Sequence, residues 1–183
     1  MTTINVPKET MVTNSSLSTR NVIDTNFTID RYDRHQVLGR VKTLLPMYGS
    51  GRTTMWFRFQ TGTFPDTYTL IVVTDRITND VVLLAELVYR SMEHTCTLET
   101  LEVIARYRNR GVGSWFLGKL LFDQVILRGN ILDLSCTDPL KPWYRKTIAY
   151  YSEKLDDAAY VVKEGPSDEE DETKLTITQI STS

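Results

Sequence analysis

The chain has 183 residues, of which 41% are hydrophobic, so it is long enough for one hydrophobic core and too short for two domains of ordinary size. Its formal net charge of -2 provides no general basic field, and we therefore expect no nucleic-acid partner. No stretch approaches the roughly 20 apolar residues that cross a bilayer, and Met1 to Arg20 lacks the apolar centre of a signal peptide, so we expect a cytoplasmic protein without a membrane partner.

The cysteines and histidines of the chain indicate neither a disulfide framework nor a metal site. Cys96 and Cys136 are far apart and lie in apolar, strand-like contexts, which suits buried, reduced thiols. His35 and His94 have no Cys, Asp or Glu at metal-ligand spacing. We therefore expect no bound metal.

The first 25 residues differ in composition from the rest of the chain. They are rich in Thr, Ser and Asn and have no sustained hydrophobic period, so they are predicted to form a flexible polar tail. Residues 26–183 are predicted to form one folded domain. A partner, including a second copy in a homodimer or larger assembly, could order the tail.

The first predicted elements are a short strand and a helix. Residues 27–30 alternate like a strand, and Asp33 is a candidate cap for a helix that Pro46 ends. The apolar face of that helix consists of Val37, Leu38, Val41, Leu44 and Leu45. Residues 48–68, with an aromatic run at 56–59, fit either an irregular lid or a strand.

An antiparallel meander is predicted next. Residues 70–74 and 81–89 are β-rich runs joined by a turn at Asp75 to Asp80, and a third run covers 95–105. A helix follows from Gly113 to about Leu127 and is stopped by Gly129 and Asn130. The continuous apolar strand 131–136 then completes a strand–helix–strand crossover.

The chain ends with a helix and two strands. Pro142 opens a helix that runs through Leu155, and strands are predicted at 159–163 and 174–180. Five acids, Asp168 to Glu172, lie between these strands. The whole pattern predicts an α/β fold with a mixed sheet.

One segment of the sequence carries a chemical signature. Residues 101–114 combine a strand, a turn with two glycines, and the start of a helix. Such a turn exposes successive backbone N–H groups at a helix N-terminus, where they bind a phosphate or pyrophosphate. Gly111 and Gly113 allow close approach of an anion, and Arg108 and Arg110 add positive charge. A tight turn without a ligand fits the same residues.

The segment resembles the signature of the GNAT superfamily of N-acetyltransferases, which is Arg or Gln, two residues, Gly, one residue, then Gly or Ala. Arg108, Gly111 and Gly113 occupy these positions, and the resemblance covers most of the chain. It implies a twisted mixed sheet of about six to seven strands with about four helices, and acetyl-coenzyme A as co-substrate. The residues that the resemblance assigns to the cofactor are Val103, Ile104, Arg108, Asn109, Arg110, Gly111, Val112, Gly113 and Ser114.

The resemblance also implies a reaction, in which a primary amine attacks the acetyl-coenzyme A thioester directly. Tyr151 matches the tyrosine that protonates the departing thiolate in many family members, although packing in the core explains the same residue. Glu102 and Glu99 are the candidate bases, and their spacing of three places them on opposite faces of the strand, so that at most one faces the acceptor. Of the two we favour Glu102. A backbone N–H near Ile104 is expected to meet the oxyanion.

The acceptor is expected to be cationic: a protein lysine or N-terminus, a polyamine, or another small amine. The acidic residues 168–172 would attract such a molecule, although a solvated loop explains them equally. The alternative function is a catalytically inactive GNAT-fold protein that acts as a structural or interaction module. Tyr144, which stands where family members often have an Asn that touches the cofactor, favours this alternative.

Overall fold

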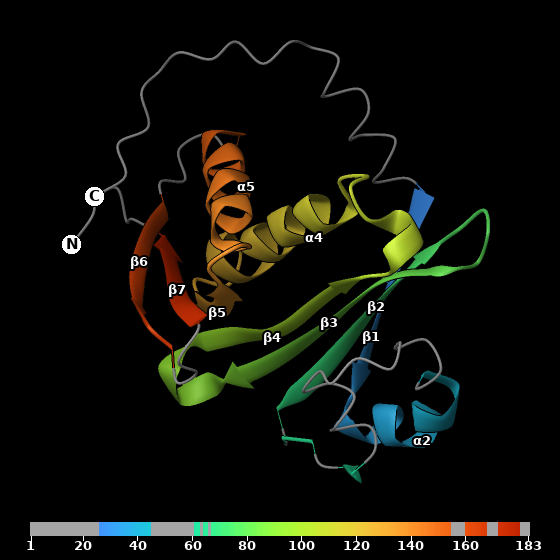
Figure 1. The fold of residues 1–183 in the computed structure, drawn as a ribbon. Coiled ribbons are helices and arrows are strands. Elements are labelled where there is room, and N and C mark those ends of the chain that lie inside the picture. Colours follow the sequence, from blue (N-terminus) through green and yellow to red (C-terminus); the bar gives the residue numbers. More distant parts are fainter. Residues whose placement is uncertain are drawn as a thin grey trace. The chain divides into compact units, whose positions relative to one another are not determined.

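The computed structural model describes residues 26–44, 61–62, 64–65, 67–154, 160–167 and 172–179. Seven strands form one mixed sheet in the order β1-β2-β3-β4-β5-β7-β6 (Figure 1). The predicted tail, most of the 48–68 segment and the acids at 168–171 lie outside the described residues. The mixed α/β sheet, its number of strands and its antiparallel meander followed by a crossover are confirmed.

The chain divides into two compact units. Of the described residues, one unit contains those between 26 and 89 and residues 98–113, and the other contains residues 90–97 and those between 114 and 179. We call them the meander unit and the helical unit, after the β1–β3 meander in the first and the helices α4 and α5 in the second.

The meander unit begins with β1 (Phe27–Asp33) and α2 (Arg34–Leu44). Asp33 caps α2 as predicted, because the Gln36 N–H donates to Asp33 Oδ1 and the Asp33 N–H donates to Gln36 Oε1, each at 2.9 Å. This reciprocal pair is a capping box and satisfies two otherwise unpaired backbone donors. The helix therefore begins where its sequence signals it.

The antiparallel part of the sheet continues with β2 (Tyr68–Asp75), β3 (Val81–Arg90) and β4 (Thr95–Val103). Between β2 and β3 the chain turns as predicted, since the Asp75 N–H donates to Asp80 O at 2.9 Å and Asn79 is left-handed at φ 57°. Strand β4 ends two residues before the prediction. A 3₁₀ turn at Ala105–Tyr107 replaces its last predicted residue.

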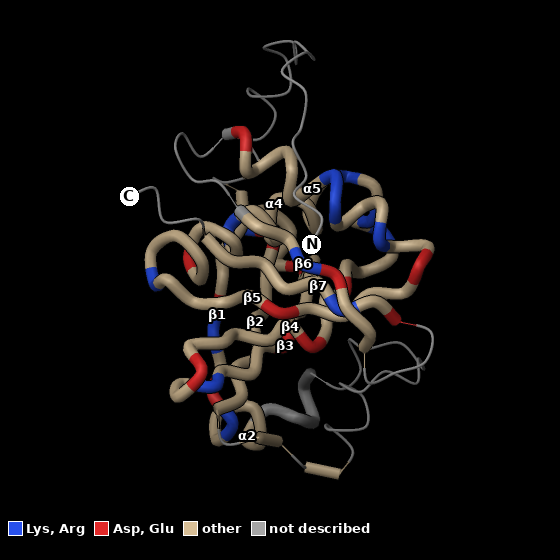
Figure 2. The backbone as a smooth tube through the Cα atoms, turned by 90° about the vertical axis from the view of Figure 1, so that its left-hand side faces the viewer, with Lys and Arg blue, Asp and Glu red and all other residues tan. Residues whose placement is uncertain are grey.

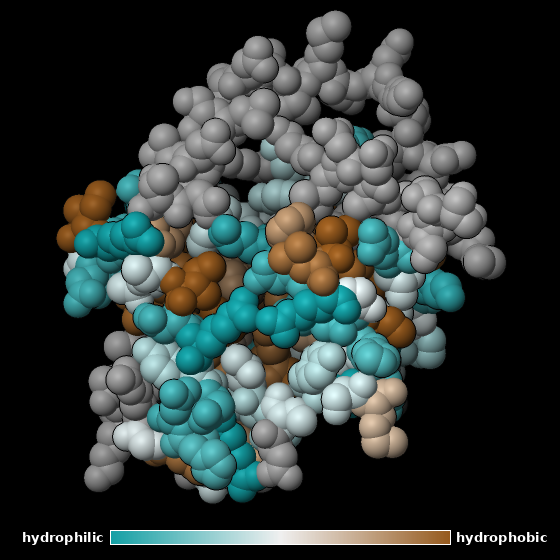
Figure 3. All heavy atoms as spheres, turned by 180° about the vertical axis from the view of Figure 1, so that it is seen from behind, coloured by the Kyte–Doolittle hydropathy of each residue, from teal (hydrophilic) through white to brown (hydrophobic). Residues whose placement is uncertain are grey.

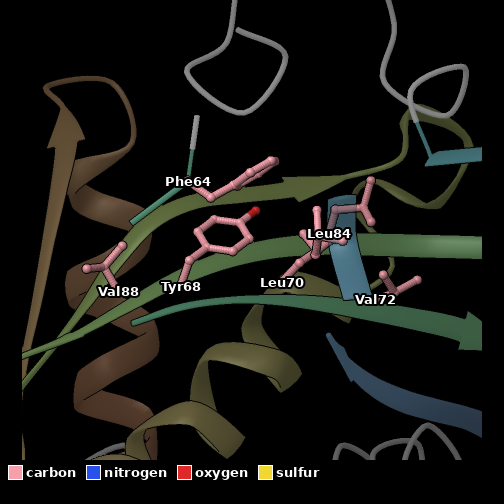
Figure 4. Close-up of a cluster of buried hydrophobic side chains, with 7 residues drawn as sticks. Phe64, Tyr68, Leu70, Val72, Leu84 and Val88 are labelled. Carbon is pink, nitrogen blue, oxygen red and sulfur yellow. The ribbon is translucent and has the colours of Figure 1, made fainter. Parts of the chain in front are cut away.

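Apolar residues pack on one face of β2 and β3 (Figure 4). Val37 of α2 and Phe64 contribute to this cluster, and the Tyr68 and Phe64 rings meet at an interplanar angle of 56° with centroids 4.8 Å apart. The remaining members are Leu70, Val72, Leu84 and Val88. Leu83 and Ile71, on the alternate positions of these strands, are also buried, which explains the continuous apolar runs in the sequence.

One charged residue interrupts the apolar run of β3. Glu86 is fully buried, and the Tyr68 hydroxyl donates to Glu86 Oε1 at 2.9 Å. The register pairs Leu70 with Glu86 and Tyr68 with Val88, so Tyr68 and Glu86 are diagonal neighbours across two strands. A buried carboxylate requires such donors, because burial without a hydrogen bond is costly.

The helical unit contains α4 (Val112–Leu120) from Ser114 onward, β5 (Ile131–Thr137), α5 (Lys141–Lys154), β6 (Tyr160–Pro166) and β7 (Glu172–Gln179). β7 pairs antiparallel with both β5 and β6. Figure 2 shows the Lys and Arg residues of α5 as blue bands, and Arg145 and Lys141 of this helix pair with Glu164 on β6. Cys96 and Cys136 are buried and are not joined in a disulfide, as expected.

The helix predicted from Gly113 to Leu127 changes type after Leu120. Residues Leu121–Ile126 form a π-helix, in which the Leu127 N–H donates to Phe122 O at 3.0 Å. Asn130 ends this segment, because its side-chain amide donates to Gln124 Oε1 at 3.0 Å and its N–H donates to Gln124 O at 2.9 Å. The helix predicted from Gly113 to about Leu127 is therefore present, and its last turns are π-helical, next to the buried and mutually bonded side chains of Asn130 and Gln124.

Exposed hydrophobic side chains are scattered over the described surface. Ile77, Met92 and Leu127 are the most exposed, at 81%, 97% and 66%. Figure 3 shows one face, on which hydrophobic and hydrophilic residues alternate in small areas. Such single exposed residues are normal on a protein surface and indicate no binding site by themselves. No helix among the described residues is long and apolar enough to cross a membrane.

Candidate functional site

The glycine turn predicted to hold coenzyme A lies between β4 and α4. After the 3₁₀ turn, Asn109 and Gly111 adopt left-handed conformations at φ 60° and φ 81°. Asn tolerates this region, whereas most other side chains do not, and Gly occupies it without strain. Because α4 begins at Val112, the first four N–H groups of this helix follow directly and have no partner within it. The turn therefore offers a row of backbone donors.

The arginines around the turn have distinct partners. Arg108 Nε donates to Val103 O at 2.9 Å, which ties the side chain to the end of β4. Arg106 forms an ion pair with Asp80 at 2.8 Å. The guanidinium carbons of Arg106 and Arg110 lie 5.2 and 5.6 Å from the centre of the Tyr107 ring. All three guanidiniums are thus oriented by neighbours in the meander unit.

Tyr107 and Asp80 are elements of this site that the sequence analysis did not identify. The Tyr107 hydroxyl donates to Asp80 Oδ2 at 3.0 Å and lies 3.3 Å from Thr78 Oγ1. The hydrogen bond from Tyr107 is the largest of the effects that lower the pKa of Asp80 below its usual value, and Arg106 adds to it. The β2–β3 turn is therefore bonded to the segment that leads into the glycine turn.

Ile104, the residue expected to supply an oxyanion donor, makes two contacts in the meander unit. Its N–H donates to Val82 O at 3.0 Å, and its side chain packs against the apolar cluster of β2 and β3. Val103, Glu102 and Ile104 are partly buried, whereas Glu99 is exposed. An oxyanion can be bound by the Ile104 N–H only if the bond to Val82 is first released.

Ser114 and Tyr151 belong to the helical unit, whereas the residues from Val103 to Gly113 that are predicted to bind the cofactor belong to the meander unit. Ser114 Oγ lies 3.3 Å from Thr147 Oγ1, a hydroxyl of α5 that is buried. This contact links the first turns of α4 to α5. The Ser114 side chain is thus engaged within the helical unit.

The Tyr151 ring lies directly against Gly118 of α4. A Cβ added at Gly118 would overlap the atoms Cζ, Cε1 and Cε2 of this ring. The adjacent Tyr150 meets the Tyr151 ring edge to face, with centroids 5.1 Å apart. Packing therefore fixes the position of the ring, a property that a core residue and a general acid both require.

Tyr144, at the position where Asn is frequent in the family, is buried on α5. Its ring meets Trp143 edge to face, with centroids 4.7 Å apart. Burial raises the pKa of Tyr144 to about 12. The residue contributes packing to the helical unit.

No group of three or more His, Cys, Asp or Glu side chains that could hold a metal occurs among the described residues.

A protein-family comparison found no matching model, and a search of curated proteins found no match. Solved structures do match this chain. A spermidine N-acetyltransferase chimera of Vibrio cholerae SpeG and hSSAT is 11% identical, with a TM-score of 0.58 over 84% of this chain and 95% of the other.

Two further structures of the Vibrio cholerae enzyme agree with the first. A dodecameric spermidine N-acetyltransferase in an intermediate state is 10% identical, with a TM-score of 0.55 over 84% of this chain and 92% of that one. The enzyme in complex with CoA and spermine is 9% identical, with a TM-score of 0.54 over 85% and 96%. The chain has the GNAT fold. At these identities the likeness establishes the fold alone, and it agrees with the resemblance carried by the glycine turn.

Proposed function

We propose that the protein is an N-acetyltransferase that transfers the acetyl group of acetyl-coenzyme A to a primary amine. The observation that carries this proposal is the glycine turn. Gly111 is left-handed at φ 81° and α4 begins at the next residue, in the GNAT fold and at the position of the GNAT signature. A helix start with a glycine turn binds phosphate groups through its N–H donors and its dipole.

In this proposal the turn binds the pyrophosphate of coenzyme A. The backbone of residues 109–113 supplies donors, and Val103 and Ile104 border the pantetheine arm. The resemblance to the GNAT superfamily assigns Ser114 to the phosphates, and its hydroxyl would then exchange its contact with Thr147 for one with the ligand. The cofactor therefore approaches the C-terminal end of β4.

The chemical step joins the amine nitrogen to the acetyl carbonyl carbon and breaks the carbon–sulfur bond. The amine must first lose a proton, for which Glu102 is the favoured base and Glu99 the second candidate. Tyr151 is assigned the role of proton donor to the departing thiolate. Its fixed position against Gly118 supports this role, because a general acid must be held close to the atom that it protonates.

The acceptor is proposed to be a cationic amine, with polyamines as the first candidates. The structural neighbours are named as spermidine N-acetyltransferases, and one of them contains spermine. A protein lysine or N-terminus remains a candidate of the same chemical class. A homodimer or larger assembly is proposed because one neighbour is dodecameric, and sedimentation analysis of the full chain tests it.

A second candidate function is a GNAT-fold interaction module without turnover. Two observations favour it. The Ile104 N–H donates to Val82, so it is engaged within the fold, and Tyr144 is a buried packing residue. Catalysis by this chain requires either that the Ile104 N–H is released from Val82 O when acetyl-coenzyme A binds or that another donor meets the oxyanion.

Calorimetric titration with acetyl-coenzyme A tests the proposed function. Micromolar binding that is lost in a Gly111→Glu variant is expected, because the variant places bulk and negative charge in the turn. Gly111→Asn, which keeps a residue that tolerates the left-handed conformation, separates backbone strain from charge. Gly165→Glu on β6 is the matched control, since a side chain there meets open space. No binding by the unmodified protein would leave the interaction module as the function.

A further inference from the structure

Three arginines lie within five residues of the glycine turn, and their surroundings are unequal. Arg106 is paired with Asp80, so its charge is locally balanced. The Arg108 side chain donates to Val103 O, which fixes it at the end of β4. Arg110 is exposed, and its guanidinium lies over the Tyr107 ring. A cation held over an aromatic ring keeps its hydrogen-bond donors available at its edge.

Tyr107 connects these residues to the β2–β3 turn. Its side chain is 9% exposed, its hydroxyl is bonded to Asp80, and its N–H donates to Ile104 O at 2.8 Å. The same ring contacts Arg106 and Arg110. The ring is therefore fixed at its hydroxyl end and at its backbone, and it provides the surface on which Arg110 lies.

The β2–β3 turn is itself well ordered by hydrogen bonds. Asp75 Oδ1 accepts the N–H groups of Ile77 and Thr78 at 2.8 and 3.2 Å. The Asp80 N–H donates to Thr78 Oγ1 at 3.3 Å, and Asp75 closes the turn through its bond to Asp80 O. Hydrogen bonds within the turn thus hold the backbone of Asp80, whose side chain accepts the bond from Tyr107.

We propose that Tyr107 is a positioning residue, which Asp80 anchors to the β2–β3 turn and which presents Arg110 to the phosphate groups of coenzyme A. This inference rests on the proposed function and adds to it the residues that orient Arg110. Asp80 balances the charge of Arg106, and the Arg108 side chain is tied to Val103 O, so Arg110 is the guanidinium that Tyr107 presents next to the backbone donors. A guanidinium suits this task because it binds phosphate oxygens through two parallel donors.

The first test separates charge from position by calorimetry with acetyl-coenzyme A at several salt concentrations. Arg110→Gln should weaken binding about tenfold and reduce the dependence of the affinity on salt, because a direct charge contact is screened. Tyr107→Phe keeps the ring and should weaken binding about three- to tenfold, the effect of one lost hydrogen bond. Its salt dependence should equal that of the unmodified protein.

The second test asks whether Tyr107 acts through Arg110. In a Tyr107→Leu background, which lacks the ring, Arg110→Gln should change the affinity by less than about twofold, since coupled residues are not additive. In turnover assays with a diamine, Tyr107→Phe should raise the KM for acetyl-coenzyme A and leave the KM for the amine unchanged. A general loss of structure would alter both values.

Tyr68→Phe is the matched control, because it also removes one buried phenol hydroxyl from the meander unit, at a bond to Glu86. It should leave the affinity for acetyl-coenzyme A unchanged. If the unmodified protein binds acetyl-coenzyme A and the Tyr107 variants bind equally well, the positioning role is overturned while the proposed function stands. If the unmodified protein does not bind, both are overturned. Equal effects of Arg110→Gln with and without the ring would also overturn the link between the two residues.

Discussion

Gly118 makes the environment of Tyr151 testable without altering the tyrosine itself. Gly118→Ala places a methyl group where the Tyr151 ring now lies, so the ring or the helix must move. A Gly→Ala change inside a helix otherwise stabilises a protein by about 1 kcal/mol, and overpacking costs about 1–3 kcal/mol. The sum is a destabilisation between zero and about 2 kcal/mol, or up to about 8 °C in Tm for a domain of this size.

Gly39 of α2 is the matched control for this substitution. A Cβ at Gly39 meets nothing within 4 Å, so Gly39→Ala has the propensity gain without the clash. It should stabilise the protein by about 0.5–1 kcal/mol. Thermal and urea unfolding of the two variants should therefore move in opposite directions.

The Tyr151 ring causes the destabilisation by Gly118→Ala only if removing the ring abolishes that destabilisation. In a Tyr151→Ala background, Gly118→Ala should be neutral or stabilising, as in Gly39→Ala. If Gly118→Ala remains equally destabilising without the ring, the packing argument is refuted. The same variants address chemistry: if Tyr151 is the general acid, Gly118→Ala and Tyr151→Phe should lower kcat while the affinity for acetyl-coenzyme A stays near that of the unmodified protein.

Three further predictions concern stability. Asp33→Ala, which removes the capping bond to the Gln36 N–H, should destabilise the protein by about 1 kcal/mol in urea unfolding. Tyr68→Phe should cost about 1–3 kcal/mol in the same assay, because Glu86 loses a buried donor. Tyr144 has its folded pKa raised to about 12 from 10.0, so the unfolded chain loses this proton first. Stability should therefore fall as the pH rises from 10 to 12, and Tyr144→Phe should remove this part of the pH dependence.

Much of the fold could be predicted because its signals are local. The Asp33 cap, the turn at Asp75 to Asp80 and the stop at Gly129 and Asn130 each depend on a few adjacent residues. Strand positions followed from continuous apolar runs, which is the pattern expected when both faces of a strand are buried. These features need no knowledge of distant contacts.

The features that the sequence did not predict depend on contacts between residues that are not adjacent. The π-helix at 121–126 is accompanied by the bonds between Asn130 and Gln124, and the apolar residues of this segment fit an α-helix equally well. Tyr107 is one aromatic residue beside three arginines, and only the folded chain brings Asp80 to its hydroxyl. The position of a Tyr between Arg106 and Arg108 was visible in the sequence, but its hydrogen-bond partner Asp80 is 27 residues away along the chain.

The bond between the Ile104 N–H and Val82 O decides how the two candidate functions differ. This donor closes the ladder at the end of β4, and at 3.0 Å it has ordinary hydrogen-bond geometry. An active enzyme must either exchange this bond for the thioester oxygen or use another donor, whereas an interaction module keeps it. Hydrogen exchange at the Ile104 amide distinguishes the cases: its protection should change on addition of acetyl-coenzyme A if the donor is redirected. Binding without any change at this amide would overturn the Ile104 N–H as the oxyanion donor, and it is the result expected of an interaction module or of an enzyme that uses another donor.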